Sequence, residues 1–310
     1  MMEEQTPLEY GRTQAPILRR LAERGLLFGT SSWKYDGWRG IVYGDRARGR
    51  GISAFLHEYA SIFPTVCADF TFYRYYDSQT FSALYDATPE GFSFALKVPQ
   101  ALLIDRYPDW FKGEMAGKDN PEFLDAEVFV QRFLEPAREL EQKLGPMIFE
   151  FGEKTTSLSP ADFMAAADAF FTRLPRDALY AVEVRRKSYL TDAYFEMLRR
   201  HNIAHVVNSQ ESAPPMDVQL TTMPVLTARH CVVRALTRPR VGYKKSVSIA
   251  EPYDRIVQEY PEGVTAMVGL ARRCESQRVT LYAYINNRLE GCAPLTISKI
   301  LAALEPPSTG

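Results

Sequence analysis

The chain has 310 residues, of which 46% are hydrophobic and 24% are charged, and its formal net charge at pH 7 is −1. These values are ordinary for a globular protein, and the charge balance argues against a protein that coats nucleic acid over its whole surface. No apolar run reaches the roughly 18 residues that a membrane span needs, and the polar, acidic start MMEE is not that of a secretory signal.

Short apolar runs typical of buried strands recur along the chain from Leu26. The eight predicted strands cover residues 26–32, 65–73, 92–98, 146–151, 178–184, 203–209, 230–236 and 279–286. Amphipathic segments separate most of them. These predict helices over residues 52–63, 78–86, 121–143, 159–174, 191–202 and 294–304. We expect Pro136 to bend the third helix, and residues 211–226 are poor in helix signals, so one helix should be missing or short there.

Strict alternation of strands and helices predicts a parallel sheet with right-handed crossovers. Eight such units favour a closed (β/α)8 TIM-type barrel over an open sheet. The Gly-x-Gly-x-x-Gly spacing of a dinucleotide site is absent after the first strand. We therefore predict one barrel domain over residues 26–305, preceded by an N-terminal extension, residues 1–25, with weak helical spacing at 17–25.

Polar residues gather where the predicted strands end, which is the functional end of a TIM-type barrel. The candidate positions are Ser31, Ser32, Trp33, Asp69, Tyr73, Arg74, Lys97, Glu150, Glu183, Arg185, Asn208, Arg234, Asn286 and Asn287.

Glu183 and Lys97 are the most telling of these, because each interrupts an otherwise hydrophobic strand. One interpretation is a structural salt network formed with Arg185 and Arg234. The other makes Glu183 a general acid or base, with Lys97, Arg185 and Arg234 binding an anionic group. The two interpretations are compatible.

Two loop segments combine cations with aromatic residues, namely residues 38–51 and 234–245. They are either solvated loops or an anion-recognition surface, with Trp33, Trp38, Tyr73 and Tyr243 as stacking faces. The same residue types would also suit single-stranded nucleic acid, or a phosphorylated small molecule.

Metal ligands and nucleophiles are weakly indicated. The four histidines do not converge, and a Mg²⁺ site formed by Asp69, Glu150 and Glu183 is left as an alternative to our expectation of no cofactor. The four cysteines are scattered without a C-x-x-C pair, which fits reduced thiols in the cytoplasm, and Cys67 has the strand position of a small buried hydrophobe.

Several stretches give the chain a family resemblance, among them GTSSWKYDGWRGIVY, FPTVCADFTFYR, YAVEVRRKSY and YAYINNRLEGCAP. Over about residues 26–305 the chain resembles the family catalogued as domain of unknown function 72, the YecE-like proteins. The resemblance implies a TIM-type barrel and no established reaction. It implies a polar mouth formed by Ser31, Ser32, Trp33, Tyr35, Trp38, Phe72, Tyr73, Arg74, Lys97, Glu183, Arg185, Arg234, Asn286 and Asn287.

The chain departs from this family's pattern in three strands. It has Cys67-Ala68-Asp69 where a Glu-x-Asn is usual, Glu150 where Gln is usual, and Asn208 near a common Asp position. The missing Glu weakens any mechanism built on a pair of glutamates. We expect a metal-independent hydrolase or lyase acting on a small anionic or sugar-like ligand, with Glu183, Lys97 and Asp69 as catalytic residues. A nucleic-acid-binding barrel and a non-catalytic ligand-binding protein remain the alternatives.

Overall fold

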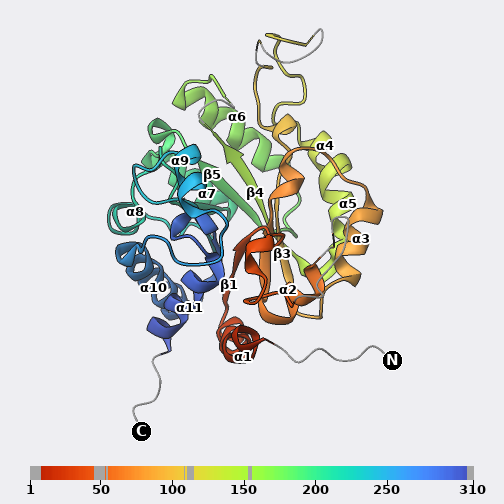
Figure 1. Ribbon diagram of the computed structural model, residues 1–310. Helices are drawn as coiled ribbons and strands as arrows, with labels where there is room; N and C mark the ends of the chain where they lie inside the picture. Colours follow the sequence, from red (N-terminus) through yellow and green to blue (C-terminus); the bar gives the residue numbers. More distant parts are fainter. Residues whose placement is uncertain are drawn as a thin grey trace.

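The computed structural model describes residues 8–44, 53, 55–107, 109, 115–152 and 156–305. Within these residues the chain forms a closed barrel of eight parallel strands in the order β1-β2-β3-β4-β5-β6-β7-β8, surrounded by helices (Figure 1). The strands are β1 Leu26–Ser31, β2 Thr65–Ala68, β3 Ser93–Lys97, β4 Leu144–Phe151, β5 Tyr180–Val184, β6 Ala204–Asn208, β7 His230–Ala235 and β8 Thr280–Ile285. The predicted TIM-type barrel is therefore confirmed, with every strand within its predicted region or a few residues of it.

The helices of the described residues follow the predicted alternation closely. They are α1 Glu9–Glu23, α2 Leu56–Ile62, α3 Ser78–Asp86, α4 Ala126–Phe129, α5 Glu135–Ala137, α6 Pro160–Arg173, α7 Asp192–His201, α8 Met216–Thr222, α9 Tyr243–Ala250, α10 Pro261–Ser276 and α11 Ala293–Leu304. The short helix expected after the sixth strand is α8. None of these helices has the length and apolar character that crossing a bilayer requires.

The helix predicted over residues 121–143 differs most from its expected form. It begins at Ala126, because the carboxylate of Asp125 accepts hydrogen bonds from the Glu127 and Val128 backbone N–H groups and caps it. The break in its path lies at Glu141, where φ is 47°, and not at Pro136. Pro136 lies in α5, which directly follows the π-helical turn Val130–Leu134, and the backbone stays helical on both sides of it.

Two helices between β7 and β8 were missed in the sequence. Their signals are present in α10, which has Pro261 in its first turn and buries Met267, Leu270 and Cys274 on one face. The second strand was predicted too long, since β2 ends at Ala68 and residues 69–72 form a 3-10 turn.

The N-terminal segment packs tightly against the barrel. Figure 1 shows α1 beneath β1 and α2 at one end of the molecule. Leu18 and Leu21 are fully buried, and the Tyr10 hydroxyl donates a hydrogen bond to the Pro294 carbonyl of α11 at 2.8 Å. Burial of these side chains ties α1 to the barrel core.

Leu18→Ala is therefore expected to lower the free energy of unfolding by about 2–5 kcal/mol, the usual cost of emptying a buried leucine site. Urea denaturation followed by circular dichroism measures this change. Arg12→Ala, on the exposed face of α1, is the matched control and should change it by less than about 0.5 kcal/mol. Equal effects of the two substitutions would show that α1 contributes little to stability.

The barrel interior changes from apolar to polar toward the C-terminal ends of the strands. Its apolar part contains Cys67, Ala95, Ile148, Ala181, Ala204, Val206, Val232 and Tyr284. Side chains two residues apart on a strand share a face, so the next interior positions lie above this plug. These positions form what we call the polar layer: Ser31, Asp69, Lys97, Glu150, Glu183, Asn208, Arg234 and Asn286.

Candidate functional site

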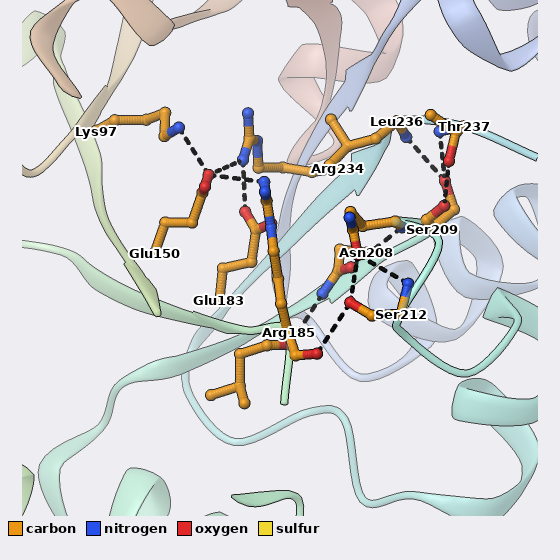
Figure 2. Close-up of polar contacts among 12 residues, drawn as sticks. Lys97, Glu150, Glu183, Arg185, Asn208, Ser209, Ser212, Arg234, Leu236 and Thr237 are labelled. Carbon is orange, nitrogen blue, oxygen red and sulfur yellow. Dashed lines mark hydrogen bonds and ion pairs between the residues drawn. The ribbon is translucent and has the colours of Figure 1, made fainter. Parts of the chain in front are cut away.

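Arg234 is the centre of a buried network of ion pairs. Its Nη1 lies 2.5 Å from Glu183 Oε2 and 2.8 Å from Glu150 Oε2, and its Nη2 lies 2.9 Å from Asp69 Oδ1. These partners come from β5, β4 and the turn after β2, so the barrel topology alone brings them together. Figure 2 shows the guanidinium of Arg234 between Glu150 and Glu183.

One oxygen of Glu150 forms ion pairs with three cations. Besides Arg234, Oε2 contacts Lys97 Nζ at 2.6 Å and Arg185 Nη2 at 2.9 Å (Figure 2). Burial by itself would raise the pKa of Glu150, but the attraction of Lys97, Arg185 and Arg234 outweighs it and lowers the pKa to about 2. Glu150 is thus a permanent carboxylate at neutral pH and is unsuited to donate a proton.

Glu183 lies beneath the network and not at its surface. Its side chain is 0% exposed, and both oxygens are engaged, Oε1 by Arg185 Nε at 3.0 Å and Oε2 by Arg234. No face of this carboxylate is open to a ligand. In this structure Glu183 contacts two arginines and presents no oxygen to the cavity, which does not favour its expected use as an acid or base.

A cavity of about 310 Å³ opens above the polar layer. Its walls are formed by Tyr35, Asp69, Phe72, Tyr73, Lys97, Glu150, Arg185, Gln210, Glu211, Arg234, Leu236, Thr237, Val241, Tyr243, Asn286 and Arg288. Most of these residues are polar or charged, and the loops after six of the strands contribute. The cavity therefore lies where barrel enzymes place their active sites.

Asp69 is the network carboxylate most open to this cavity. Its side chain is 30% exposed, whereas those of Glu150 and Glu183 are 7% and 0% exposed. Oδ1 is held by Arg234 and by the weak thiol donor of Cys67, with Sγ at 3.5 Å. Within the described part of the chain Oδ2 receives no hydrogen bond, so it is available to a ligand.

The sequence-based site residues divide into two groups. Those that line the cavity are Tyr35, Asp69, Phe72, Tyr73, Lys97, Glu150, Arg185, Arg234, Tyr243 and Asn286. Those outside its lining are Ser31, Ser32, Trp33, Trp38, Arg74, Glu183, Asn208 and Asn287. Ser31 is buried in the polar layer, and its Oγ has no hydrogen-bond partner among the described residues.

The expectation that Trp33 and Trp38 offer stacking faces to a ligand is wrong, because both are buried. Trp38 stacks against Tyr43 and Tyr59, and its Nε1 donates to Asn287 Oδ1 at 3.1 Å. Trp38 therefore connects the loop after β1 with the loop after β8.

The remaining outlying residues also have local roles. Asn287 Oδ1 additionally accepts from the Ala293 backbone N–H at 2.8 Å, and the Arg74 guanidinium lies over the Tyr76 ring at 4.5 Å. Ser32 has a φ of 70°, and its backbone N–H donates to the Cys67 carbonyl. Arg46, Arg48 and Arg50 lie outside the described residues.

Sequence reasoning missed some cavity residues, of which Arg288 is the most important. It follows the polar-layer position Asn286 by two residues, and the Asn286 Oδ1 accepts a hydrogen bond from its backbone N–H at 3.0 Å. Gln210 and Glu211 come from the loop after β6 in the same way. These residues could have been found from their short distance in sequence from a strand end. A search for charged residues within the strands does not detect them.

The structure bears on whether Cys67 could act as a nucleophile and whether the carboxylates could bind a metal ion. Burial and, second, nearby Asp69 raise the pKa of the Cys67 thiol well above its usual value, so it is no thiolate at neutral pH. Asp69, Glu150 and Glu183 are each paired with Arg234, whose positive charge would repel a divalent cation. Over the described residues no cluster of three or more His, Cys, Asp or Glu has a metal-binding arrangement.

A second and larger hollow lies elsewhere on the described part of the molecule. It measures about 560 Å³, lies on the outside of the barrel between α8 and α10, and is lined by side chains such as Leu220, Ala266 and Leu270. It contains none of the polar layer, so we place the candidate site in the smaller cavity.

Fold and site together define a (β/α)8-barrel protein with a charged cavity at the C-terminal ends of its strands. The chain belongs to the family described as Protein of unknown function DUF72, which matches residues 27–309. No curated protein matches the chain.

Two solved structures of the same family resemble this one. A DUF72 family protein of Enterococcus faecalis shares 17% identity with a TM-score of 0.61, covering 90% of this chain and 95% of its own. A DUF72 family protein of Thermotoga maritima shares 22% identity with a TM-score of 0.57, covering 89% and 96% respectively. At these identities the likeness shows the fold.

Proposed function

We propose that the protein is a metal-independent enzyme, a hydrolase or a lyase, that acts on a small anionic or sugar-like ligand in the 310 Å³ cavity. The observation that carries the proposal is the buried ion network beneath the cavity, in which Asp69 keeps one oxygen available. Buried charges are costly to maintain, and they cluster where a protein prepares an electrostatic environment for chemistry.

The geometry suggests a division of labour among the charged groups. Asp69, held by Arg234, would accept or return a proton, since it is the cavity-facing carboxylate with the greatest exposure. Lys97 and Arg185 would stabilise negative charge that develops on the ligand. Glu183 and Glu150 would fix these cations in place.

The test of this proposal begins by identifying a ligand that the protein binds. The purified protein is denatured and the released small molecules are identified by mass spectrometry; each compound is then added back and its stabilisation of the protein and its conversion are followed. Conversion in the presence of EDTA supports a metal-independent reaction. Compounds that bind but stay intact with stoichiometric protein favour the non-catalytic alternative.

Asp69→Asn is expected to lower turnover of such a compound by about 10²–10⁴-fold, the usual contribution of a general acid or base. Its effect on ligand affinity should be much smaller, because the amide keeps the shape and one hydrogen-bonding oxygen. Single-turnover kinetics and calorimetry measure the two quantities. Asp36→Asn, on the exposed turn after β1, is the matched control. Unchanged turnover in Asp69→Asn would reject the assigned role.

The nucleic-acid alternative has less support at this opening. Of the cations in residues 234–245, Arg234 is buried in the network and Arg238 is half-buried, which leaves Arg240, Lys244 and Lys245 exposed. Binding to single-stranded oligonucleotides that weakens steeply with salt would revive it, and no binding at low salt would remove it.

A further inference from the structure

Arg288 differs from every other cation of the cavity. It lies in the 3-10 turn Asn287–Leu289 directly after β8, is half-buried, and its guanidinium lies 4.7 Å from the centre of the Tyr243 ring. Lys97, Arg185 and Arg234 each contact at least one carboxylate, whereas no carboxylate within the described ranges forms an ion pair with Arg288.

The Arg288 side chain also has an unused donor. Its Nε is buried and has no hydrogen-bond partner among the residues described. A guanidinium that loses water contacts without gaining an anion is energetically unfavourable. Its position in the cavity wall means that a ligand can supply the missing anion.

Among the described residues, the rest of the cavity leaves this positive charge uncompensated. In the network below, three carboxylates (Asp69, Glu150, Glu183) face three cations (Lys97, Arg185, Arg234), so the formal charges balance. Glu211 also lines the cavity and forms no ion pair with the described cations, but it is exposed. Water therefore screens its charge far more than that of half-buried Arg288.

The neutral part of the lining suits hydroxyl groups. Gln210, Thr237 and Asn286 provide uncharged donors and acceptors around the cavity, and Asp69 Oδ2 is free to accept. Tyr35 and Tyr243 add flat apolar faces of the kind on which a sugar ring can lie.

We propose that Arg288 binds the single anionic group of a polyhydroxylated ligand, a carboxylate or a phosphate, whose hydroxylated body lies over the polar layer. This inference rests on the proposed function, because it assumes that the cavity is the ligand site, and it narrows the ligand to a sugar derivative with one anionic group. A guanidinium recognises either anion with paired hydrogen bonds.

Isothermal titration calorimetry with four sets of probes tests the inference: hexonates, hexose monophosphates, the parent neutral hexoses, and inorganic phosphate. A hexonate or a hexose monophosphate should bind more tightly than both its neutral parent and inorganic phosphate, and the tighter of the two identifies the anion. Arg288→Gln should weaken that binding by about 10- to 100-fold, the range of a charged hydrogen bond. Arg240→Gln, an exposed arginine outside the cavity lining, should leave it unchanged.

The other outcomes distinguish the role of Arg288 from the role of the cavity as a ligand site. Equal binding of neutral and anionic sugars, or binding that Arg288→Gln does not weaken, would overturn the role of Arg288 while the cavity stays a ligand site. If inorganic phosphate bound as tightly as any hexose phosphate, the proposal that the ligand has a hydroxylated body would be rejected. Failure of all four sets of probes would contradict both this inference and the sugar-like ligand of the proposed function.

Discussion

Arg234→Met is expected to lower the free energy of unfolding by about 3–5 kcal/mol. Arg234 is buried and pairs with Asp69, Glu150 and Glu183 at once, so its removal leaves three carboxylates with less compensation. A buried charge without a partner costs far more than the pair contributes. Urea denaturation at pH 7 measures the change.

Two further variants make the result interpretable. Arg234→Lys keeps the charge, but a single ammonium cannot reach all three carboxylates in the geometry of the guanidinium, so an intermediate loss is expected. Arg20→Met breaks the surface pair with Glu305 and should cost less than about 1 kcal/mol. If Arg234→Met were no worse than Arg20→Met, the network would not be a coupled unit.

Glu150→Gln should remove a large pH-dependent contribution to stability. The folded-state pKa of Glu150, about 2, lies below the reference value of 4.5. A carboxylate with a lowered pKa stabilises the folded state fully above the unfolded-state pKa, and this contribution is lost as pH falls through the folded-state value. The depression corresponds to about 3 kcal/mol at neutral pH.

The measurement is the difference in unfolding free energy between wild type and Glu150→Gln from pH 7 down to pH 2. This difference should be largest above about pH 5 and should shrink through the window from about pH 4.5 to pH 2. Glu135→Gln, on a surface pair with Arg138, should give a small difference with little pH dependence. Parallel curves for wild type and Glu150→Gln would contradict the ion-pair account of this carboxylate.

The fold could be predicted from the sequence because its signals are local and repeated. Apolar strand runs, amphipathic helices and the absence of a Gly-x-Gly-x-x-Gly turn each limited the topology. The same logic predicted Lys97, Arg185 and Arg234 at one end of the barrel, since a polar residue in a buried strand needs a partner.

The finer details of the site depend on how deeply each side chain is buried, which a sequence pattern does not show. Glu183 and Asp69 both follow small interior residues by two positions, but Glu183 lies deep in β5, whereas Asp69 begins a turn after β2 and reaches the cavity. Trp38 was assigned to the opening because loops are usually exposed, yet it packs on Tyr43 and Tyr59. Arg288 was overlooked because its significance depends on its having no carboxylate partner among the described residues.

The apolar part of the barrel interior, beneath the polar layer, limits how a ligand can enter and leave the cavity. Side chains such as Ile148, Val232 and Tyr284 fill the inside of the barrel completely enough to be buried. Within the described part of the chain these side chains close the cavity toward the N-terminal ends of the strands. A ligand that enters between the loops therefore leaves by the same route, so release of one molecule precedes binding of the next.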